Sequence, residues 1–323
     1  MAKQIGVIID YLNDGYRRQI DAAAAKHGYT TRYYPDSASA VGNADECEIL
    51  FGHCSQKVIA SAASLRWYCC CWAGVDRFCR DELYQNPDCV LSNSSGAYGV
   101  TISEHLVMTA LMLLRRQMEY TEIIREGGWR VLPGGIRSLR DLRITVLGAG
   151  DIGTEFARRA RAFGPARLTG VRRSAKAGDP AFDEMRTTAE LDALLPETDL
   201  LVMALPNTPD TEGILSRARL ALLPEGAYVI NVGRGTAVDQ DALIDALNGG
   251  RLAGAALDVV VPEPLPADHP LRGARNLLLT PHVAGNMTLP YTQQKSISMF
   301  LEDLDNYAAG RPLLHAVDRK KGY

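Results

Sequence analysis

Three polar residues in the second half of the chain have the types that acid–base and anion chemistry needs. They are Arg234 in "INVGRGTAVD", Glu263 in "ALDVVVPEPLP" and His282 in "LLTPHVAG". A histidine titrates near neutrality, and an adjacent carboxylate favours its charged form. A guanidinium stabilises negative charge that develops on an oxygen. Each residue alone could be a strand cap, an exposed turn or a surface loop, but together they could protonate and polarise a carbonyl group.

A glycine-rich stretch, "ITVLGAGDIGTEFA", lies between an apolar run and a helix-like segment. Gly148, Gly150 and Gly153 have the G-x-G-x-x-G spacing. The first glycine makes a tight turn, the second lets the backbone approach a pyrophosphate, and the third lets helix and strand pack closely. The helix N-terminus offers N–H groups to the phosphates. A structural glycine turn is the alternative, but the surrounding strand and helix pattern favours dinucleotide binding.

Basic residues gather where the next strand of this unit ends, in "LTGVRRSAK". NAD-binding units usually have an acidic residue about 20 residues after the loop, which binds the ribose 2′-hydroxyl. Arg172 and Arg173 occupy that place, and the first carboxylate after them is Asp179. Because a guanidinium binds a 2′-phosphate, we expect these arginines to select NADP(H). Ser174 and Lys176 are further candidates, and a solvated basic turn is the alternative.

Six apolar runs separated by crossover-sized segments predict a doubly wound parallel sheet in the second half of the chain. They are "LRITVLGAG", "ARLTGV", "DLLVMAL", "GAYVINV", "RLAGAALDV" and "NLLLTPH". Ligands collect at the carboxyl ends of strands in such sheets, so Arg234, Glu263 and His282 should converge beside the nucleotide. An arginine, a carboxylate and a histidine next to a nicotinamide suit hydride transfer to a 2-keto acid.

The first 95 residues alternate short apolar runs with helix-like segments, which predicts a small parallel α/β unit. Thr101 and Glu104 have the spacing of a capping box, and they predict one long helix over residues 101–128. The Pro- and Gly-containing stretch "VLPGGIRSLRD" then reads as a connecting arm. A last helix-like run, "YTQQKSISMFLEDLDNYAAG", follows the final strand.

The size and charge of the chain limit its class. A length of 323 residues with 46% hydrophobic residues indicates a large core and two domains. The formal charge is −3, from 35 basic and 38 acidic residues, so no overall field favours nucleic acid or an anionic membrane. The N-terminus lacks the pattern of a secretory signal, and the longest apolar run, residues 106–114, is far shorter than the roughly 20 residues of a membrane span. We expect a cytoplasmic protein.

All seven cysteines lie in the first 90 residues, and Cys69, Cys70 and Cys71 are consecutive. Neighbouring residues of a strand point to opposite faces, which suits neither a disulfide framework nor a C-x-x-C metal site. We expect free, small hydrophobic thiols in a reducing compartment and no metal site, with a redox or metal role as the alternative.

These motifs resemble the D-isomer-specific 2-hydroxyacid dehydrogenase family over nearly the whole chain. They are "LGAGDIG", "ALPNTPDTEGIL", "INVGRGTAVD", "ALDVVVPEPLP" and "LLTPHVAG", with looser matches in "WAGVDRF" and "NSSGAYGVTISEH". The resemblance implies an α/β protein in which a Rossmann domain, residues 98–289, is inserted into a flavodoxin-like substrate-binding domain, residues 1–97 and 290–323. It also implies a homodimer built on the nucleotide domain, with the helix of residues 101–128 and the arm as contacts.

The resemblance also implies roles for single residues. Arg234 binds the substrate carboxylate and polarises the keto oxygen, His282 protonates that oxygen, and Glu263 holds the imidazole. Backbone N–H groups of Gly74 and Val75 bind the substrate carboxylate. The implied cofactor contacts beyond the glycines and arginines are Thr101, Asp151, Ile152, Pro206, Thr211, Val232, Asp258 and Ala284.

Two of the expected site residues have simpler alternatives. The resemblance places Asp258 on the nicotinamide carboxamide, but a carboxylate in its position could also cap a strand end. His53, in "FGHCS", is a candidate for lining the pocket, although a solvated loop histidine is the simpler expectation.

The expected function is NADPH-dependent reduction of a small 2-keto acid, such as hydroxypyruvate or glyoxylate, to the D-2-hydroxy acid. The resemblance is strongest to the glyoxylate/hydroxypyruvate reductases, and NAD(H) use is possible. An NAD-linked D-2-hydroxyacid or phosphoglycerate dehydrogenase is the enzymatic alternative, and a formate dehydrogenase fits less well. An NADP(H)-sensing protein like the corepressors that share this fold is an alternative of another class.

Overall fold

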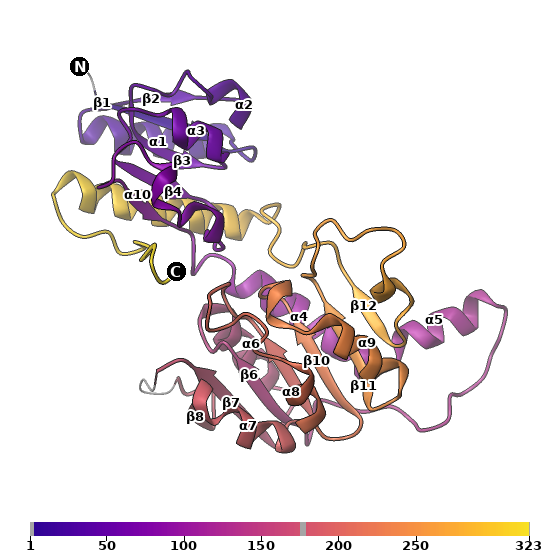
Figure 1. Cartoon of the computed structure of the whole chain (residues 1–323). Coiled ribbons are helices and arrows are strands. Elements are labelled where there is room, and N and C mark those ends of the chain that lie inside the picture. The colour runs from indigo at the N-terminus through magenta and orange to yellow at the C-terminus, as the bar shows by residue number, and fades with distance from the viewer. Residues whose placement is uncertain (1–2, 175–178, 323) are drawn as a thin grey trace. The chain divides into compact units, whose positions relative to one another are not determined.

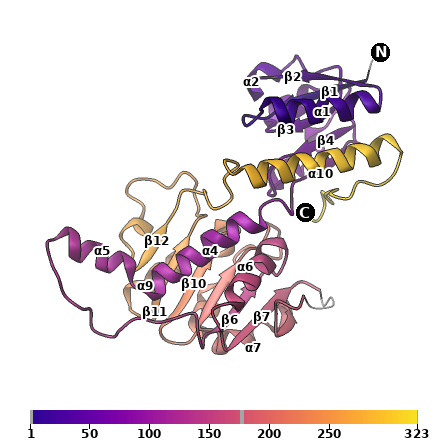
Figure 2. The ribbon, with the colours of Figure 1, turned by 180° about the vertical axis from the view of Figure 1, so that it is seen from behind.

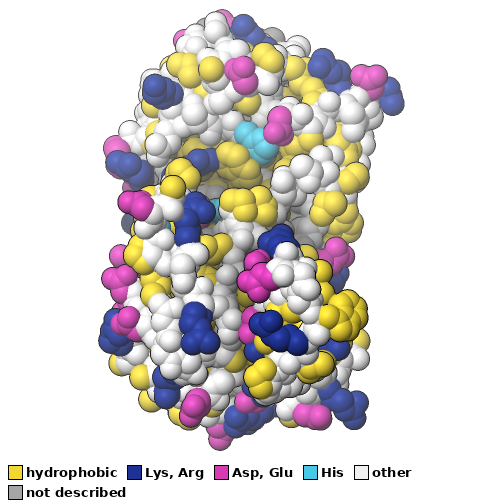
Figure 3. Space-filling view, turned by 90° about the vertical axis from the view of Figure 1, so that its right-hand side faces the viewer, with side chains coloured by type: hydrophobic (Ala, Val, Ile, Leu, Met, Phe, Trp, Pro, Cys, Tyr) yellow, Lys and Arg dark blue, Asp and Glu magenta, His cyan; other side chains and the backbone are white. Residues whose placement is uncertain are grey.

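The computed structural model describes residues 3–174 and 179–322. The chain forms two compact units, one of Met1–Tyr98 with Asn286–Tyr323 and the other of Gly99–Gly285 (Figure 1). In the ranges that the structure describes, no helix has the length and apolar character needed to cross a bilayer. Basic and acidic side chains are interspersed on the face shown in Figure 3, so neither sign of charge dominates there.

The first unit contains a five-stranded parallel sheet with the strand order β2-β1-β3-β4-β5. Its strands are β1 (Lys3–Ile8), β2 (Tyr29–Tyr33), β3 (Cys47–Gly52), β4 (Trp67–Cys70) and β5 (Val90–Ser92). Its helices are α1 (Asp14–Lys26), α2 (Ser37–Ala40), α3 (Gln56–Ser61) and α10 (Pro290–Ala308), with the short 3-10 turns η1 (Asp76–Phe78) and η2 (Asp81–Leu83). This order is that of flavodoxin-like folds, and it reverses direction between β1 and β3.

Helices cover both faces of this sheet. Helices α1 and α10 pack together on one face, while α2 and α3 lie on the other (Figures 1 and 2). Phe300 of α10 stacks on Phe51 of β3 with ring centroids 4.2 Å apart, which ties the C-terminal helix to the N-terminal segment. Strand β2 escaped prediction because "YTTRY" is a half-exposed edge strand with little apolar character.

The second unit contains a seven-stranded parallel sheet in the order β12-β11-β10-β9-β6-β7-β8. The strands are β6 (Arg143–Leu147), β7 (Arg167–Arg172), β8 (Glu184–Thr187), β9 (Leu200–Met203), β10 (Ala227–Asn231), β11 (Leu252–Leu257) and β12 (Leu277–Leu279). All six predicted strands are present. The seventh, β8, is a short edge strand of sequence "EMRT" without an apolar run.

Two layers of helices cover the second sheet. Helices α4 (Gly99–Leu114) and α6 (Asp151–Arg161) pack against each other on one face (Figure 2). The other face carries α7 (Leu191–Leu194), α8 (Arg217–Leu222) and α9 (Gln240–Asn248), whose leucines form a continuous apolar core with the strands (Figure 1). The shorter turns are η3 (Thr188–Glu190), η4 (Leu195–Glu197), η5 (Gly235–Ala237) and η6 (Pro270–Gly273).

The predicted single helix over residues 101–128 is wrong in two ways. Helix α4 begins at Gly99, so Thr101 lies buried inside its first turn and is no N-cap. The helix ends at Leu114, and a second helix, α5 (Gln117–Arg125), follows Arg116, whose backbone is left-handed with φ of 56°. The Arg116 guanidinium binds Glu119 through two hydrogen bonds of 2.7 and 2.6 Å, which stabilises this break.

Helix α5 and the residues after it extend away from the rest of the second unit (Figures 1 and 2). Trp129 is 93% exposed and Val131 86% exposed. The seven cysteines, by contrast, are all free, and six of them are buried. Burial raises the pKa of the thiols of Cys69, Cys70 and Cys71, which makes them poor nucleophiles.

Candidate active site

The glycine-rich loop joins β6 to α6, and its glycines meet different requirements. Gly148 has φ of +103°, and a Cβ there would lie 2.5 Å from the Ala204 carbonyl oxygen. A Cβ on Gly153 would lie 2.4 Å from the Gly148 carbonyl oxygen, so helix and loop pack without room for a side chain. A Cβ on Gly150, the N-cap of α6, would meet no described atom within 4 Å. The open backbone at this helix N-terminus fits a dinucleotide pyrophosphate.

The structure brings the first arginine of the basic turn to this loop. Arg172 is the last residue of β7, which pairs with β6, and its Nε donates a hydrogen bond to the Ala149 carbonyl. Arg173 and Ser174 follow on the exposed surface, and Lys176 lies outside the described residues. Asp179 accepts hydrogen bonds from the Ala181 N–H and from Arg158, and these interactions hold its pKa below the ordinary range.

The loops that follow β9, β10 and β11 pack closely at two glycines, where there is no room for a side chain. A Cβ on Gly233 would lie 2.6 Å from the backbone nitrogen and oxygen of Leu205. A Cβ on Gly235 would lie 2.4 Å from the Val260 carbonyl. Arg234 stands between these two glycines, so its backbone is fixed by close packing on both sides.

Asn231, the last residue of β10, holds the Arg234 loop through hydrogen bonds of its side chain. Its side chain is buried, its Oδ1 accepts a hydrogen bond from the Gly233 N–H at 2.9 Å, and its Nδ2 donates to the Arg234 carbonyl at 2.8 Å. The Arg234 guanidinium itself donates to the Gly233 carbonyl at 2.8 Å. Asn231 was not predicted, although a polar residue at the end of a buried strand, two residues before a glycine, was the available signal.

His282 and Glu263 lie next to each other, as the sequence predicted. The distance between His282 Nδ1 and Glu263 Oε2 is 2.8 Å. The other carboxylate oxygen, Oε1, accepts a hydrogen bond from the Val260 N–H at 3.0 Å, which holds the side chain in place. Since a carboxylate only accepts, the Nδ1 proton points to Glu263 and the Nε2 atom faces away from it. The side chains are 50% and 38% exposed.

The backbone of His282 is left-handed, with φ of 55°, and its N–H donates to the Asp258 carbonyl at 2.9 Å. A residue other than glycine occupies this region rarely, and such conformations cluster at functional sites. In this conformation the imidazole lies beside Glu263.

Asp258 holds the loop that carries His282. Its buried carboxylate accepts hydrogen bonds from Thr280 Oγ1 at 2.6 Å, from the Val283 N–H at 2.9 Å and from the Ala284 N–H at 3.0 Å. These contacts make Asp258 the strand-end cap that was the alternative expected from the sequence. A contact between Asp258 and a nicotinamide carboxamide stays a prediction.

Comparisons with known proteins agree with this geometry. Residues 107–284 match the family model described as "D-isomer specific 2-hydroxyacid dehydrogenase, NAD binding domain". The chain belongs to the D-isomer-specific 2-hydroxyacid dehydrogenase family. As a member of this family it is an NAD(P)-dependent oxidoreductase, and the seven-stranded unit is its Rossmann domain.

Three relatives of this dehydrogenase illustrate the similarity. Glyoxylate/hydroxypyruvate reductase A of Escherichia fergusonii is 37% identical over 226 residues, which are 70% of each chain. A D-isomer specific 2-hydroxyacid dehydrogenase from Xanthobacter autotrophicus, solved with NADPH and MES, is 28% identical, with a TM-score of 0.84 and full coverage of both chains. An NADPH-dependent glyoxylate/hydroxypyruvate reductase from Sinorhizobium meliloti, solved with NADP and sulfate, is 27% identical, with a TM-score of 0.82 over 99% of this chain and 100% of that one.

The other predicted cofactor contacts of this family member lie in the same unit. Thr211 Oγ1 donates to the Pro206 carbonyl at 2.7 Å and closes the loop after β9. Val232 directly follows β10, Ala284 lies in the loop after β12, and Thr101 lies at the start of α4; all three are buried. Helix α4 lies close to the glycine loop. A Cβ on Gly99, the first residue of α4, would lie only 2.5 Å from the Asp151 carboxylate. Ile152 is half-buried in the first turn of α6.

Gly74 and Val75 of this dehydrogenase lie in the loop after β4, in the first unit. Three donors hold the carbonyl groups just before them: Tyr98 Oη on Cys71 at 2.7 Å, the Ser94 N–H on Trp72 at 3.2 Å and Asn93 Nδ2 on Ala73 at 2.7 Å. Among the described residues, no acceptor takes the N–H groups of Gly74 and Val75. The loop therefore offers two adjacent donors, an arrangement that suits an anion.

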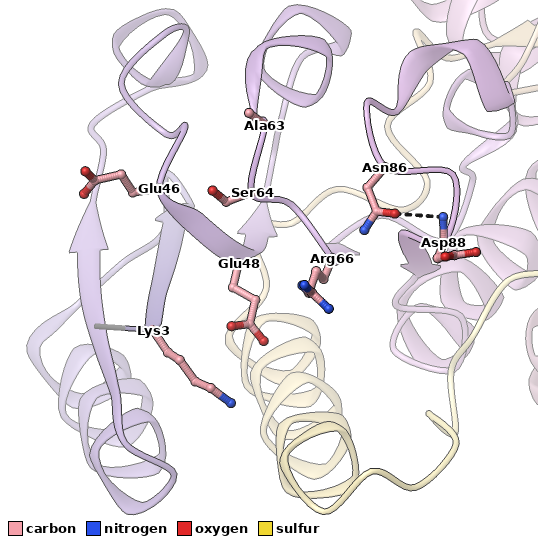
Figure 4. A pocket seen from close by; sticks show the side chains of 8 residues that line it. All are labelled: Lys3, Glu46, Glu48, Ala63, Ser64, Arg66, Asn86 and Asp88. Atoms are coloured by element: carbon pink, nitrogen blue, oxygen red, sulfur yellow. Dashed lines mark hydrogen bonds between the residues drawn. The ribbon is translucent and has the colours of Figure 1, made fainter. Parts of the chain in front are cut away.

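The first unit also has a cavity of about 520 Å³, at the end of its sheet opposite to the Gly74 loop. Its lining residues stand at or before the amino ends of strands β1, β3, β4 and β5 (Figure 4): Lys3, Glu46, Glu48, Ala63, Ser64, Arg66, Asn86 and Asp88. Glu48 is already bound by the hydroxyls of Tyr29 at 2.8 Å and Tyr307 at 3.1 Å. Because ligands of such sheets bind at the carboxyl ends of strands, this cavity is no part of the predicted site.

Proposed function

We propose that the protein reduces a small 2-keto acid to the D-2-hydroxy acid with NADPH. The observation that carries the proposal is the His282–Glu263 pair, 2.8 Å apart, at the same sheet edge as the glycine loop and the Arg234 loop. An acid, its carboxylate partner and a guanidinium beside a dinucleotide-binding loop form the set that carbonyl reduction requires.

His282 is the proton donor of the proposed reaction. The bound nicotinamide supplies a hydride to the keto carbon. Protonated His282 gives its Nε2 proton to the keto oxygen, so the C=O bond becomes a hydroxyl and the imidazole becomes neutral. Glu263 stabilises the protonated ring and keeps Nε2 aimed at the substrate, because it is itself fixed by the Val260 N–H.

Arg234 and the first unit position the substrate. The guanidinium binds the substrate carboxylate and stabilises the negative charge that grows on the keto oxygen. The adjacent N–H groups of Gly74 and Val75 are the proposed donors to the substrate carboxylate in the first unit, since neither has an acceptor among the described residues. The unit of residues 1–98 and 286–323 is accordingly the proposed substrate-binding domain.

Arg172 and Arg173 give the preference for NADPH over NADH in this proposal. Arg172 is docked through its Nε on the glycine loop, which leaves the two Nη nitrogens to bind a 2′-phosphate. The relatives from Xanthobacter autotrophicus and Sinorhizobium meliloti were solved with NADPH and NADP, which supports the assignment. Curated relatives named glyoxylate/hydroxypyruvate reductase A favour hydroxypyruvate and glyoxylate as substrates.

A homodimer is the proposed assembly, with the extended segment after α4 as the contact. Ile124, Trp129, Val131 and Ile136 are between 48% and 93% exposed there. Apolar side chains gathered on one projecting segment mark an interaction site. Light scattering should give twice the chain mass for the protein and the single mass for a Trp129→Ser, Val131→Ser variant.

The decisive experiment measures reduction of a panel of 2-keto acids with NADPH and NADH in parallel. We expect turnover of hydroxypyruvate or glyoxylate with NADPH, and loss of turnover in His282→Ala with NADPH binding retained. Binding of NADPH without turnover of any keto acid would instead favour a nucleotide-sensing protein.

A further inference from the structure

His53 lies at the topological switch point of the first sheet. It directly follows β3, and its N–H donates to the carbonyl of Ile8, the last residue of β1, at 2.7 Å. Gly52 permits this approach, because it has φ of +126° and a Cβ there would lie 2.0 Å from the same carbonyl oxygen. Ligands of flavodoxin-like folds bind at the carboxyl ends of the strands where the strand order reverses, here between β1 and β3.

Aromatic neighbours fix the His53 ring, so the expectation of a solvated loop histidine is wrong. The ring stacks on the Trp72 indole with centroids 4.5 Å apart and an interplanar angle of 19°. Tyr11 meets it edge-on at 6.1 Å, and the Arg77 guanidinium lies 4.4 Å from the Trp72 centroid. Only 17% of the His53 side chain is exposed.

The two nitrogens of the His53 ring differ in their surroundings. Nδ1 lies 3.4 Å from Asp10 Oδ1, which favours the tautomer with its proton on Nδ1. Nε2 is buried and has no hydrogen-bond partner among the described residues, and the same holds for the hydroxyl of Tyr11. Burial lowers the pKa of His53, against the opposing effect of Asp10, which favours the neutral ring with Nε2 as an acceptor.

We propose that His53 Nε2 accepts a hydrogen bond from a hydroxyl group on the third carbon of the 2-keto acid, with the Tyr11 hydroxyl as its neighbour. The proposal rests on the proposed function, in which Gly74 and Val75 hold the substrate carboxylate. Trp72, on which the His53 ring stacks, precedes Gly74 by two residues in the same loop. In this proposal, a small acid whose carboxylate is bound at this loop places its third carbon next to the stacked rings.

This chemistry separates substrates of similar size. A hydroxymethyl group, as in hydroxypyruvate, donates a hydrogen bond to the acceptor nitrogen. A methyl group, as in pyruvate, leaves that nitrogen unpaired, which a buried polar atom tolerates poorly. A second carboxylate has no proton to donate to Nε2 and would lie near Asp10. The expected order is hydroxypyruvate well above pyruvate, by about 10- to 100-fold in kcat/KM.

The test compares hydroxypyruvate and pyruvate, with NADPH, in the wild type and two variants. His53→Phe keeps an aromatic ring on Trp72 and removes both nitrogens, so it should lower kcat/KM for hydroxypyruvate by about 10- to 100-fold and change that for pyruvate little. His53→Gln keeps an acceptor and should recover part of the preference.

His27 offers a matched control in the same unit. Its side chain is also 17% exposed and also faces a carboxylate, Asp305, at 2.5 Å, but it stands at the end of α1, outside the loops at the switch point. His27→Phe should leave the ratio of the two kcat/KM values unchanged. NADPH affinity should also stay unchanged for every variant, and unchanged turnover of pyruvate reports that the first unit is intact.

The outcomes separate the two proposals. A wild-type preference for hydroxypyruvate that His53→Phe abolishes supports the assignment of His53. Turnover of keto acids with equal rates for hydroxypyruvate and pyruvate, or a preference that survives in His53→Phe, overturns the role of His53 and leaves the proposed function intact. Absence of turnover with every keto acid overturns both. If His53→Phe does not fold, His53→Gln decides instead: a preference that is smaller than that of the wild type but still present supports the assignment, and a preference equal to that of the wild type overturns it.

Discussion

The two sheets of this dehydrogenase use the same backbone device at their switch points. In the Rossmann sheet, Gly148 after β6 has a positive φ and approaches the Ala204 carbonyl after β9. In the flavodoxin-like sheet, Gly52 at the end of β3 has a positive φ and approaches the Ile8 carbonyl at the end of β1. Each close approach brings two loops together where a ligand can bind.

The two switch points differ in what surrounds the glycine. At the first, a helix N-terminus and backbone N–H groups follow, and they bind phosphates through a fixed sequence pattern. At the second, aromatic rings and a histidine follow, and no short motif encodes them. We infer a division of labour, in which the Rossmann loops determine the cofactor and the proton donor, and the loops of the first unit determine the substrate side chain.

Of the variants considered, His282→Ala should have the largest effect on activity, because it removes the proposed proton donor. His282→Ala should lower kcat by about 10²- to 10⁴-fold for every keto acid, because the acid serves the keto oxygen and not the side chain. Steady-state kinetics with hydroxypyruvate and pyruvate would check this. His269→Ala, an exchange of a loop histidine in the same unit, is the control. A loss confined to one substrate would place His282 in substrate selection and contradict the division.

The next largest effect on activity is expected from a substitution of Arg234. Arg234→Lys keeps the charge but loses the planar fork, so kcat/KM should fall about 100-fold for all 2-keto acids. The ratio of NADPH to NADH use should not change. If this variant retained wild-type kinetics, Arg234 would be a surface residue, and the close packing of Gly233 and Gly235 would serve the fold alone.

Loss of the basic turn should change only the choice of cofactor. Arg172→Gln with Arg173→Gln should raise the KM for NADPH about 10- to 100-fold and leave that for NADH nearly unchanged, since two charge-assisted contacts to the 2′-phosphate are lost. Arg167→Gln, at the other end of β7, is the matched control because its side chain pairs with Glu197 at 2.6 Å. Equal losses for both cofactors would show that the arginines stabilise the loop instead.

The smallest effect is expected at the amino edge of the Rossmann sheet. Burial raises the pKa of Asp199, but hydrogen bonds from the Arg143 side chain and backbone, between 2.9 and 3.1 Å, outweigh it and lower the pKa. A lowered carboxylate pKa stabilises the fold above the ordinary value near 4, and this contribution is lost as pH falls through the lowered pKa.

Asp199→Asn should therefore reduce the free energy of unfolding by about 1 kcal/mol at pH 7. The difference from wild type should shrink as the pH approaches 3. Urea unfolding at both pH values measures it, and kcat/KM at pH 7 should not change. A change in kcat/KM for this variant would contradict the expectation that only the carboxyl ends of the strands, and not their amino ends, serve the reaction.

The sequence predicted the Rossmann half of the molecule well because its ligand chemistry depends on the backbone. Glycine spacing, buried strands and polar strand ends are local signals, and they placed the glycine loop, the His282–Glu263 pair and six strands. Strands β2 and β8 lacked such a signal because they are polar edge strands. The break at Arg116 was missed because a left-handed arginine has no sequence signature.

The first unit was less predictable because its loops are arranged by contacts between residues that are distant in the sequence. The stacking of His53 on Trp72 joins loops after β3 and β4, and the carbonyls before Gly74 are held by residues that follow β5. Asn231 and Asp258 show a related limit. Their residue types were visible in the sequence, but only the packed loops reveal that they hold Arg234 and His282 in place.

The most direct test of the division of labour combines the two specificity variants in one set of measurements. The ratio of kcat/KM for NADPH over NADH and the ratio for hydroxypyruvate over pyruvate are measured for wild type, for Arg172→Gln with Arg173→Gln, and for His53→Phe. We predict that the arginine variant lowers only the cofactor ratio and that His53→Phe lowers only the substrate ratio. Variants that shift both ratios together, or neither, would contradict the account.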